Sequence, residues 1–224
     1  MKKIILTAVV LFTVAFASAQ DKKESTGFGF TEGNVLLEGN FSFNSSTSTD
    51  SFNGNDIEED KLSNLGFNPK VGYFFSDKFA FGVELNVLSG KNENTVFGNP
   101  NVVTETKSNG FGAGVFARYY FLDLGQRFKT YTELGLGFGS IKNELNGTEV
   151  SKQSGVGLGF DLGINYFVSE SFAINFGLAN VLSYNSSKIE TPSGAETKIN
   201  QLSGDFNIFR NFFDTPQFGL TFKF

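Results

Sequence analysis

Residues 67–87 read FNPKVGYFFSDKFAFGVELNV, and apolar side chains occupy alternate positions on both sides of a short polar interruption. A period of two is the signature of a β-strand with two unlike faces. The interruption, Ser76-Asp77-Lys78, predicts a tight turn between two antiparallel strands. One face of this hairpin is rich in Phe, Tyr, Val and Leu. The other is mainly Gly, Asn and a few charges, with Phe74 as its one large apolar exception.

The same alternation recurs along the chain and predicts eight strands. They cover about 34–44, 67–75, 79–87, 110–121, 128–140, 154–167, 172–184 and 218–224. Connections after the second, fourth and sixth strands are short, whereas the others are longer and polar, as in 45–60, 89–109 and 143–152. This asymmetry is typical of outer-membrane barrels, which have short periplasmic turns and long surface loops. We therefore predict an all-β fold, an eight-stranded antiparallel up-and-down transmembrane β-barrel.

Residues 199–209 also look extended, and two interpretations stay open. They form a membrane-distal extension of the eighth strand, interrupted near Asp214-Thr215-Pro216, or they are part of a loop. If both 199–209 and the C-terminal stretch were full spanning strands, the number of strands would be odd.

The N-terminus predicts export. Lys2 and Lys3 precede an apolar run from Ile4 to Phe16 and the small-residue site Ala17-Ser18-Ala19, the pattern of a secretory signal peptide. An uncleaved membrane anchor is the alternative, but the run is short for a spanning helix. The predicted organisation is a signal peptide (1–19), a short periplasmic lead-in (20–33) and an outer-membrane barrel (34–224).

Composition excludes most catalytic arrangements. The 224 residues include no His and no Cys, which removes imidazole bases, thiol nucleophiles and disulfides. The acidic stretch 45–60 does not have calcium-loop spacing, because Gly54 would place Thr49 at the first ligand position. Loss of two lysines with the signal peptide changes the net charge from −5 to −7, which disfavours nucleic acid as a partner. We expect a non-enzymatic protein with no catalytic residue, cofactor or metal.

The two faces predict which side meets the membrane. A soluble barrel would bury its aromatic face and show the glycine-rich face to water, yet that face carries roughly one charge per strand and would make a poor soluble surface. Inside a narrow eight-stranded barrel, small residues leave room for a few long ones. We therefore expect the apolar face outside. Its aromatics near the short turns should form one membrane-interface girdle: Tyr73, Phe75, Phe79, Tyr119, Phe121, Phe128, Tyr166, Phe172 and Phe224.

Charged residues then point into the lumen, and they alternate in sign along the first five strands. The predicted lumen charge network is Glu38, Lys70, Glu84, Arg118, Glu133, Asp161 and Lys223. Glu84 and Glu133 flank Arg118 on the neighbouring strands, and the guanidinium fork can bridge two carboxylates. The network is interpreted as a plug of paired buried charges; a proton or ion path is the alternative.

The hairpin 67–86, the strand FGAGVFARYYF (111–121) and the ending FGLTFKF (218–224) together resemble the outer-membrane β-barrel family common in Bacteroidetes-type bacteria, related to porin-like, OmpX-like and OmpA-like eight-stranded barrels. The resemblance implies location in the outer membrane and a C-terminal signal for the barrel assembly machinery, carried by Phe218, Leu220, Phe222 and Phe224. It supports no OmpA-type cell-wall tether, since no further domain follows.

The expected function is a structural or adhesion-like role for a cell-surface protein of a Gram-negative bacterium. Its expected partners are outer-membrane lipid, the barrel assembly machinery and an extracellular ligand bound through the surface loops. The alternative function is a narrow porin or small-solute transporter.

Overall fold

The computed structural model describes residues 27–205 and 217–224. The predicted signal peptide lies outside this part of the chain. The described residues form nine strands: β1 (Val35–Phe52), β2 (Asn55–Ser76), β3 (Phe79–Val96), β4 (Val102–Leu124), β5 (Phe128–Leu145), β6 (Thr148–Ser169), β7 (Phe172–Glu190), β8 (Glu196–Gly204) and β9 (Gln217–Lys223). Within the same ranges, no helix is long and apolar enough to cross a membrane.

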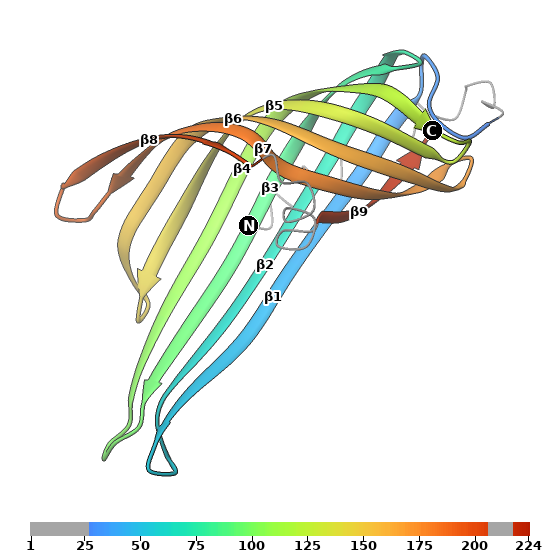
Figure 1. Cartoon of the computed structure of the whole chain (residues 1–224). Coiled ribbons are helices and arrows are strands. Elements are labelled where there is room, and N and C mark those ends of the chain that lie inside the picture. Colours follow the sequence, from blue (N-terminus) through green and yellow to red (C-terminus); the bar gives the residue numbers. More distant parts are fainter. Residues whose placement is uncertain (1–26, 206–216) are drawn as a thin grey trace.

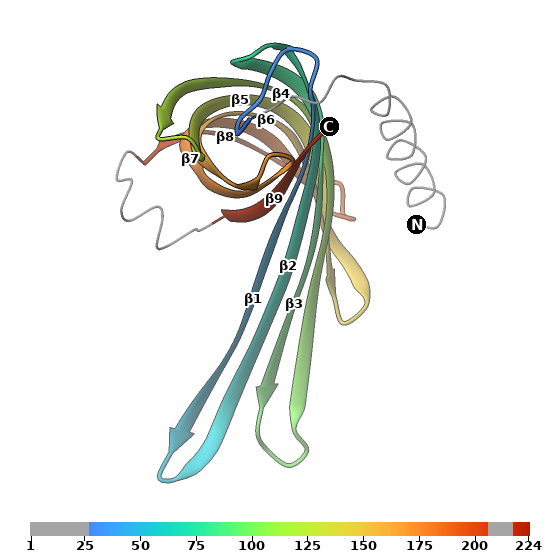
Figure 2. The same ribbon diagram turned by 90° about the vertical axis from the view of Figure 1, so that its right-hand side faces the viewer.

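The strands close into a barrel. From β1 to β8, each strand pairs antiparallel with the next along the chain. β9 pairs with β1 on one side and with residues 172–177 of β7 on the other, while residues 182–190 of β7 pair with β8. β8 and β9 therefore share one position in the wall. The fold is a closed eight-stranded antiparallel barrel, as predicted (Figures 1 and 2).

The structure also decides between the two interpretations of residues 199–209. Residues 199–204 belong to β8, and the pairing of β8 with the far part of β7 makes it a distal extension of the eighth strand position. The predicted interruption at Asp214-Thr215-Pro216 lies outside the described residues.

The predicted loops 45–60, 89–109 and 143–152 are wrong in large part, because the strands continue through most of them. β1 and β2 pair from the barrel as far as Phe52↔Asn55, and β5 and β6 pair as far as Leu145↔Thr148. The turns there are Asn-Gly pairs: φ is 51° and 81° at Asn53-Gly54, and 49° and 80° at Asn146-Gly147. Both residues need positive φ in a two-residue hairpin turn of this kind, which favours Asn and Gly.

Figures 1 and 2 show the result of this lengthening. The far ends of β1, β2, β3 and β4 project well beyond the barrel as a twisted sheet, and shorter hairpins project from the other strands. Pairing between β1 and β9 ends at Phe41↔Phe218, and among the described strands the rest of β1 pairs with β2 alone. The barrel therefore carries a large ordered sheet at the end opposite its short turns.

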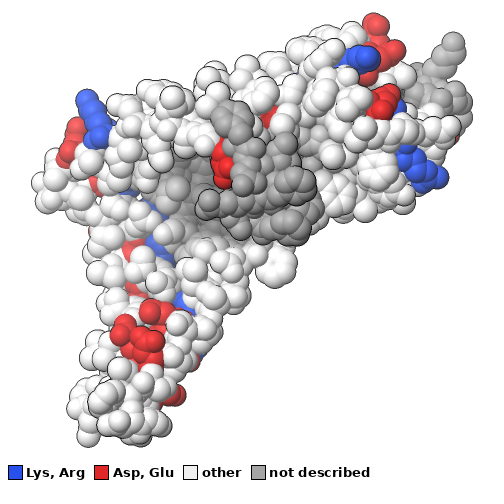
Figure 3. All heavy atoms as spheres, in the orientation of Figure 1, with Lys and Arg blue, Asp and Glu red and all other residues white. Residues whose placement is uncertain are grey.

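The apolar face points outward, as the alternation predicts. Leu134, Leu136 and Phe138 on β5 are 50%, 54% and 64% exposed, while the glycines between them line the lumen. Most of the predicted girdle aromatics are 40% or more exposed near the short turns: Tyr73, Phe75, Phe79, Tyr119, Phe121 and Phe128. In Figure 3, charged atoms gather towards the ends of the molecule and leave the wall between them largely uncharged. Such a surface suits lipid rather than water.

Beyond this apolar belt the outward face changes to Lys and Glu. Across β3 and β4, Lys91 lies 2.8 Å from both Glu93 and Glu105, and Lys107 lies 2.5 Å from Glu105. Similar pairs follow on the other hairpins, at Lys142–Glu144, Lys142–Glu149, Lys188–Glu190 and Lys188–Glu196. Exposed pairs contribute little to stability. They indicate where the apolar belt ends and the water-exposed sheet begins.

Acid should loosen this outer sheet. The hydrogen bond from Lys107, followed by that from Lys91, lowers the pKa of Glu105 from 4.5 to about 2. A carboxylate with a lowered folded pKa stabilises the fold above its ordinary pKa, and this contribution is lost as the pH falls from 4.5 towards about 2. We expect amide exchange near residues 93 and 105, corrected for intrinsic rates, to accelerate in that window.

Two comparisons check this expectation. Amides inside the apolar belt should show no such acceleration, and Glu105→Gln should show faster local exchange already at neutral pH. If amide exchange accelerated equally in the apolar belt and in the outer sheet as the pH falls, the ion pairs of Glu105 would not be what stabilises the outer sheet.

Candidate functional site in the barrel lumen

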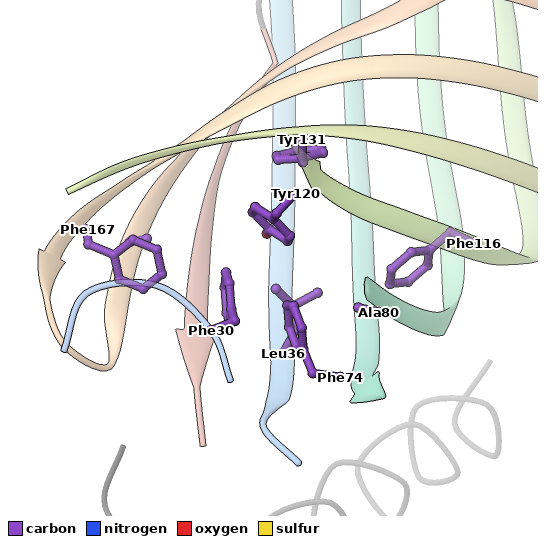
Figure 4. Packing of buried hydrophobic residues seen from close by; sticks show 9 residues of the cluster. Phe30, Leu36, Phe74, Ala80, Phe116, Tyr120, Tyr131 and Phe167 are labelled. Atoms are coloured by element: carbon purple, nitrogen blue, oxygen red, sulfur yellow. The ribbon is translucent and has the colours of Figure 1, made fainter. Parts of the chain in front are cut away.

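Apolar and aromatic side chains fill the lumen near the short turns (Figure 4). Phe74, the exception on the polar face of the opening hairpin, is fully buried here and stacks on Phe30 with ring centroids 4.3 Å apart. Tyr120 and Phe167 also contact the ring of Phe30. The buried cluster comprises Phe30, Leu36, Phe74, Ala80, Phe116, Tyr120, Tyr131, Phe167 and Ala173.

The end of the predicted lead-in supplies part of this plug. Gly33 N–H donates to the Phe74 carbonyl over 2.8 Å, which joins the segment to β2. The Lys223 ammonium donates to the carbonyls of Gly27 and Gly29 over 3.0 and 2.9 Å. Phe28 lies under the Arg127 guanidinium, 4.4 Å from the ring centroid. Residues 27–33 are thus held inside the barrel mouth.

Arg118 is the centre of a buried ion cluster above the aromatic plug. Its Nη1 and Nη2 each donate to one oxygen of Glu38 over 2.8 Å, a bidentate pair. Its Nε lies 2.7 Å from Glu133 Oε2, and its guanidinium carbon lies 4.0 Å from the centroid of the Tyr131 ring. Both carboxyl groups are 5% exposed or less, so the bonds form away from bulk water.

Lys70 on β2 extends the cluster to Glu84 on β3. Its ammonium bonds to Glu133 and lies 3.1 Å from Glu84 Oε2. The prediction that Arg118 bridges Glu84 and Glu133 is therefore wrong in one partner, because Glu38 takes the place of Glu84. The physical reason is register: Lys70 and Glu84 are direct cross-strand partners on β2 and β3, whereas Glu38 reaches Arg118 across the lumen.

The two remaining predicted charges lie apart from this cluster. Lys223 is at the barrel mouth, where it holds the N-terminal segment. Asp161 on β6 is the cross-strand partner of Glu133 and lines the cavity described below. The structure thus brings together Glu38, Lys70, Glu84, Arg118 and Glu133, and places Lys223 and Asp161 on either side of them.

Neutral polar side chains complete the hydrogen-bond network around the ion cluster. Tyr120 and Tyr131 donate over 2.7 Å to Asn165 and Asn175, and Thr221 donates to Glu38 Oε2 over 2.9 Å. Within residues 27–205 and 217–224, no buried side-chain nitrogen or oxygen lacks a hydrogen-bond partner. The same residues contain no group of three or more potential ligands that could hold a metal ion. A fully paired network of this kind supports a fixed plug.

Above the ion cluster the lumen widens into a cavity of about 730 Å³. Its floor carries Lys70, Glu84 and Glu133, and its walls reach to the outer parts of β5, β6, β7 and β8. The lining is mainly glycine, amide and hydroxyl: Asn86, Gly112, Gly135, Gly137, Gly139, Ser140, Gln153, Ser154, Gly155, Gly157, Gly159, Asn185, Ser186, Ser187 and Gln201. The lumen is therefore filled at one end and hollow at the other.

Sequence reasoning missed three features of this site. Phe28 and Phe30 stand out in a polar stretch, and this was the signal that the lead-in packs against something. Phe74 on the polar face was a second signal. The contact between Glu38 and Arg118 had no local signal, since the two residues lie 80 positions apart on strands that are not neighbours.

A closed antiparallel barrel with an apolar outer wall and a polar, charged lumen defines a membrane-spanning β-barrel. The model of the family described as outer membrane protein beta-barrel domain matches residues 6–222, so the chain belongs to that family. This confirms the family resemblance and indicates the outer membrane as the location. The bacterial group stays a prediction.

Several solved structures are similar to this chain. OprG from Pseudomonas aeruginosa is 20% identical over 88% of this chain and 98% of its own, with a TM-score of 0.46. Outer membrane protein W from E. coli is 12% identical over 87% and 99%, with a TM-score of 0.43. Ail, the attachment invasion locus protein of Yersinia pestis, is 17% identical over 86% and 99%, with a TM-score of 0.39. No curated protein matches the chain.

Proposed function

We propose that this protein is a non-enzymatic, non-conducting outer-membrane barrel that uses its projecting sheet to contact molecules outside the cell, a structural or adhesion-like role. The short-turn end and the lead-in face the periplasm, and the sheet stands outside. Outer-membrane lipid surrounds the apolar belt. The extracellular partner binds through extended strands, where the sequence predicted loops.

One observation carries this proposal: apolar side chains are exposed at the tips of the sheet, past the Lys and Glu pairs. Ile57 is 47% exposed, and its carbonyl accepts a hydrogen bond from Phe97 N–H over 3.0 Å. Val96 pairs across the turn with Val102, which is 59% exposed, and Val103 is 52% exposed. Val102 and Val103 are successive residues of β4 and point to opposite faces, so these apolar groups lie on both faces of the sheet end. We call Ile57, Val96, Phe97, Val102 and Val103 the tip patch. Apolar groups gathered in water mark sites of interaction.

The acidic surroundings of the tip patch add to this interpretation. Asp50, Asp56, Glu58, Glu59 and Asp60 lie on the neighbouring β1–β2 hairpin. An apolar centre with a polar rim is the usual anatomy of a protein interface.

The alternative, a narrow porin or small-solute transporter, needs a continuous path through the barrel. The aromatic cluster and the paired charges both occupy the bore. This packing favours the surface role over conduction.

Adhesion of whole cells tests the proposed function. Cells with the wild-type protein should bind surfaces coated with protein or polysaccharide better than cells with Ile57→Ser, Phe97→Ser, Val102→Ser and Val103→Ser combined. A matched control replaces the exposed Leu145 and Val150 on the β5–β6 hairpin by Ser. Equal adhesion of wild type, tip variant and cells without the protein on every coating would refute the proposal.

Deletion of Phe224 tests the predicted assembly signal. Phe218, Leu220 and Phe222 are 40–48% exposed on the outward face of β9, and Phe224 exchanges two backbone hydrogen bonds with Val35. We expect deletion to lower outer-membrane levels and to cause periplasmic accumulation or degradation, measured by fractionation and immunoblot. Phe224→Tyr, which keeps an aromatic end, should assemble nearly as well as wild type. Unchanged levels after deletion would show that the machinery does not need this residue.

A further inference from the structure

Outward-facing side chains follow one order on each strand from β3 to β8 as the strand leaves the apolar belt. On β3, Val87 is followed on the outward face by Ser89, Lys91 and Glu93. The other strands likewise pass from a large apolar or aromatic residue through Ser or Asn to Lys and then Glu, with one bulged residue on β6. We call these lysines the lysine row: Lys91, Lys107, Lys142, Lys152, Lys188 and Lys198.

Cross-strand pairing alone does not explain this order of charges. Within each hairpin, lysine lies directly opposite lysine, at Lys91↔Lys107, Lys142↔Lys152 and Lys188↔Lys198. Glutamate lies directly opposite glutamate, at Glu93↔Glu105, Glu144↔Glu149 and Glu190↔Glu196. Like charges directly opposite one another are destabilising, and the diagonal Lys–Glu pairs offset only part of that cost. Reversing the order on every second strand would place Lys opposite Glu, yet every strand keeps lysine nearer the apolar belt.

The lysine row also stays at one height above the apolar belt. Lys107 on β4 pairs with Glu144, so Lys142 on β5 lies two residues closer to the belt than the direction of cross-strand pairing would place it. The same step in the same direction recurs between β6 and β7, at Lys152↔Glu190. Strands of a closed barrel are tilted and their register is staggered, so a row that is level with the membrane has to step back in this way.

The ammonium groups of the row are accessible to an anion. The side chains of four of them are 36–46% exposed: Lys91, Lys107, Lys142 and Lys188. Their ion pairs are with the glutamates, which lie on the side away from the apolar belt. Within the described part of the chain, Lys152 and Lys198 form no salt bridge. Since an ammonium has three donors, the row keeps donors for a ligand on its membrane side.

We propose that the lysine row binds the phosphate groups of anionic lipid in the outer leaflet of the outer membrane. The apolar residues beneath the row contact the acyl chains, and the Ser and Asn residues between them lie at the level of the head groups. A phosphate bound between two facing lysines removes the repulsion that their register imposes. The inference deepens the proposed function and rests on its orientation, in which the projecting sheet stands outside the cell.

The association of spin-labelled lipid with the refolded barrel in phosphatidylcholine vesicles tests the proposal. The measured quantity is the motionally restricted fraction of phosphatidic acid and of phosphatidylcholine that carry the same labelled chain. Both leaflets contain the probe, so the result does not depend on the direction of insertion. Lipid sites beside a lysine should favour phosphatidic acid about fivefold, which corresponds to about 1 kcal/mol per lysine. Averaged over all sites around the barrel, the preference should be about twofold or more.

A charge-order variant separates a lipid site from general attraction. It exchanges Lys and Glu on all three hairpins, as in Lys91→Glu with Glu93→Lys, so the net charge and the number of Lys–Glu pairs are kept while carboxylates take the places nearest the membrane. The preference for phosphatidic acid should then fall by half or more. Replacing all six lysines of the row by Gln should give the same loss. The matched control is Lys78→Gln in the exposed turn after β2, which should keep most of the preference.

Two outcomes would overturn the proposal: equal association of both lipids with wild type, or an unchanged preference in the folded charge-order and Gln variants. Inorganic phosphate distinguishes lipid from a free anion. If it displaced phosphatidic acid more than sodium chloride of equal ionic strength does, the row would be a site for free anions. Since no variant alters the tip patch, loss of lipid preference with normal cell adhesion would leave the proposed function standing.

Discussion

Arg118→Ala should lower the free energy of unfolding of the refolded barrel by about 3–5 kcal/mol, the usual cost of removing one partner from a buried ion pair. Arg118 is 1% exposed and holds the carboxylates of Glu38 and Glu133. Without the guanidinium, the hydrogen-bond donors that Glu38 keeps among the described residues are Thr221 and Asn40. Urea unfolding in lipid vesicles, followed by gel mobility of the folded form, measures the change.

Two further variants give this prediction its controls. Arg118→Lys keeps the charge but loses the fork that spans two carboxylates, so it should lie between wild type and Arg118→Ala. Adding Glu38→Gln to Arg118→Ala removes one of the two uncompensated carboxylates and should recover part of the stability. A loss below about 1 kcal/mol for Arg118→Ala, typical of surface pairs, would mean that the cluster is not a buried plug.

Leu158→Arg should cost about 2–4 kcal/mol of stability in a bilayer and should impair insertion, because it places a cation on the lipid-facing wall. Leu158 is 43% exposed and faces Leu136 across the β5–β6 pair, well inside the apolar belt. Folding yield in lipid vesicles and urea titration both report the effect.

The control for this variant changes the other face of the same strand. Gly159 lines the lumen, and a Cβ added there would meet Asp161 Oδ2 at 4.0 Å and no nearer atom. Gly159→Ser should therefore insert and fold nearly as well as wild type. Equal folding of Leu158→Arg and Gly159→Ser would reverse the assignment of the two faces.

Local sequence patterns predicted most of the barrel wall. Alternation in 67–87 is enough to place Phe75 and Phe79 outside and Lys70 and Glu84 inside, because successive side chains on a strand point to opposite faces. The same logic failed in the outer sheet. Water lies on both faces there, so Ser, Thr and Asn fill a strand such as β1 without any alternation. The Asn53-Gly54 and Asn146-Gly147 pairs were the available signal for its hairpins.

The lumen shows a different limit of sequence reasoning. Which residues point inward follows from the period of two, and so does the pairing of direct neighbours such as Lys70 and Glu84. Which long side chains meet across the bore depends on how the barrel closes. Arg118 meets Glu38 there, and Phe30 reaches Phe74 from a segment outside the strands. These contacts needed the three-dimensional structure.

Single-channel recording of the refolded wild-type protein in a planar bilayer is the most direct test of the claim that the lumen is closed. The aromatic plug around Phe30 and Phe74 and the paired charges around Arg118 predict conductance at the background level of the bilayer. Arg118→Ala should lose stability without gaining a steady current, because the aromatic plug remains. A steady unitary current in wild type that Arg118→Ala increases without loss of stability would contradict the closed lumen and favour a gated pore.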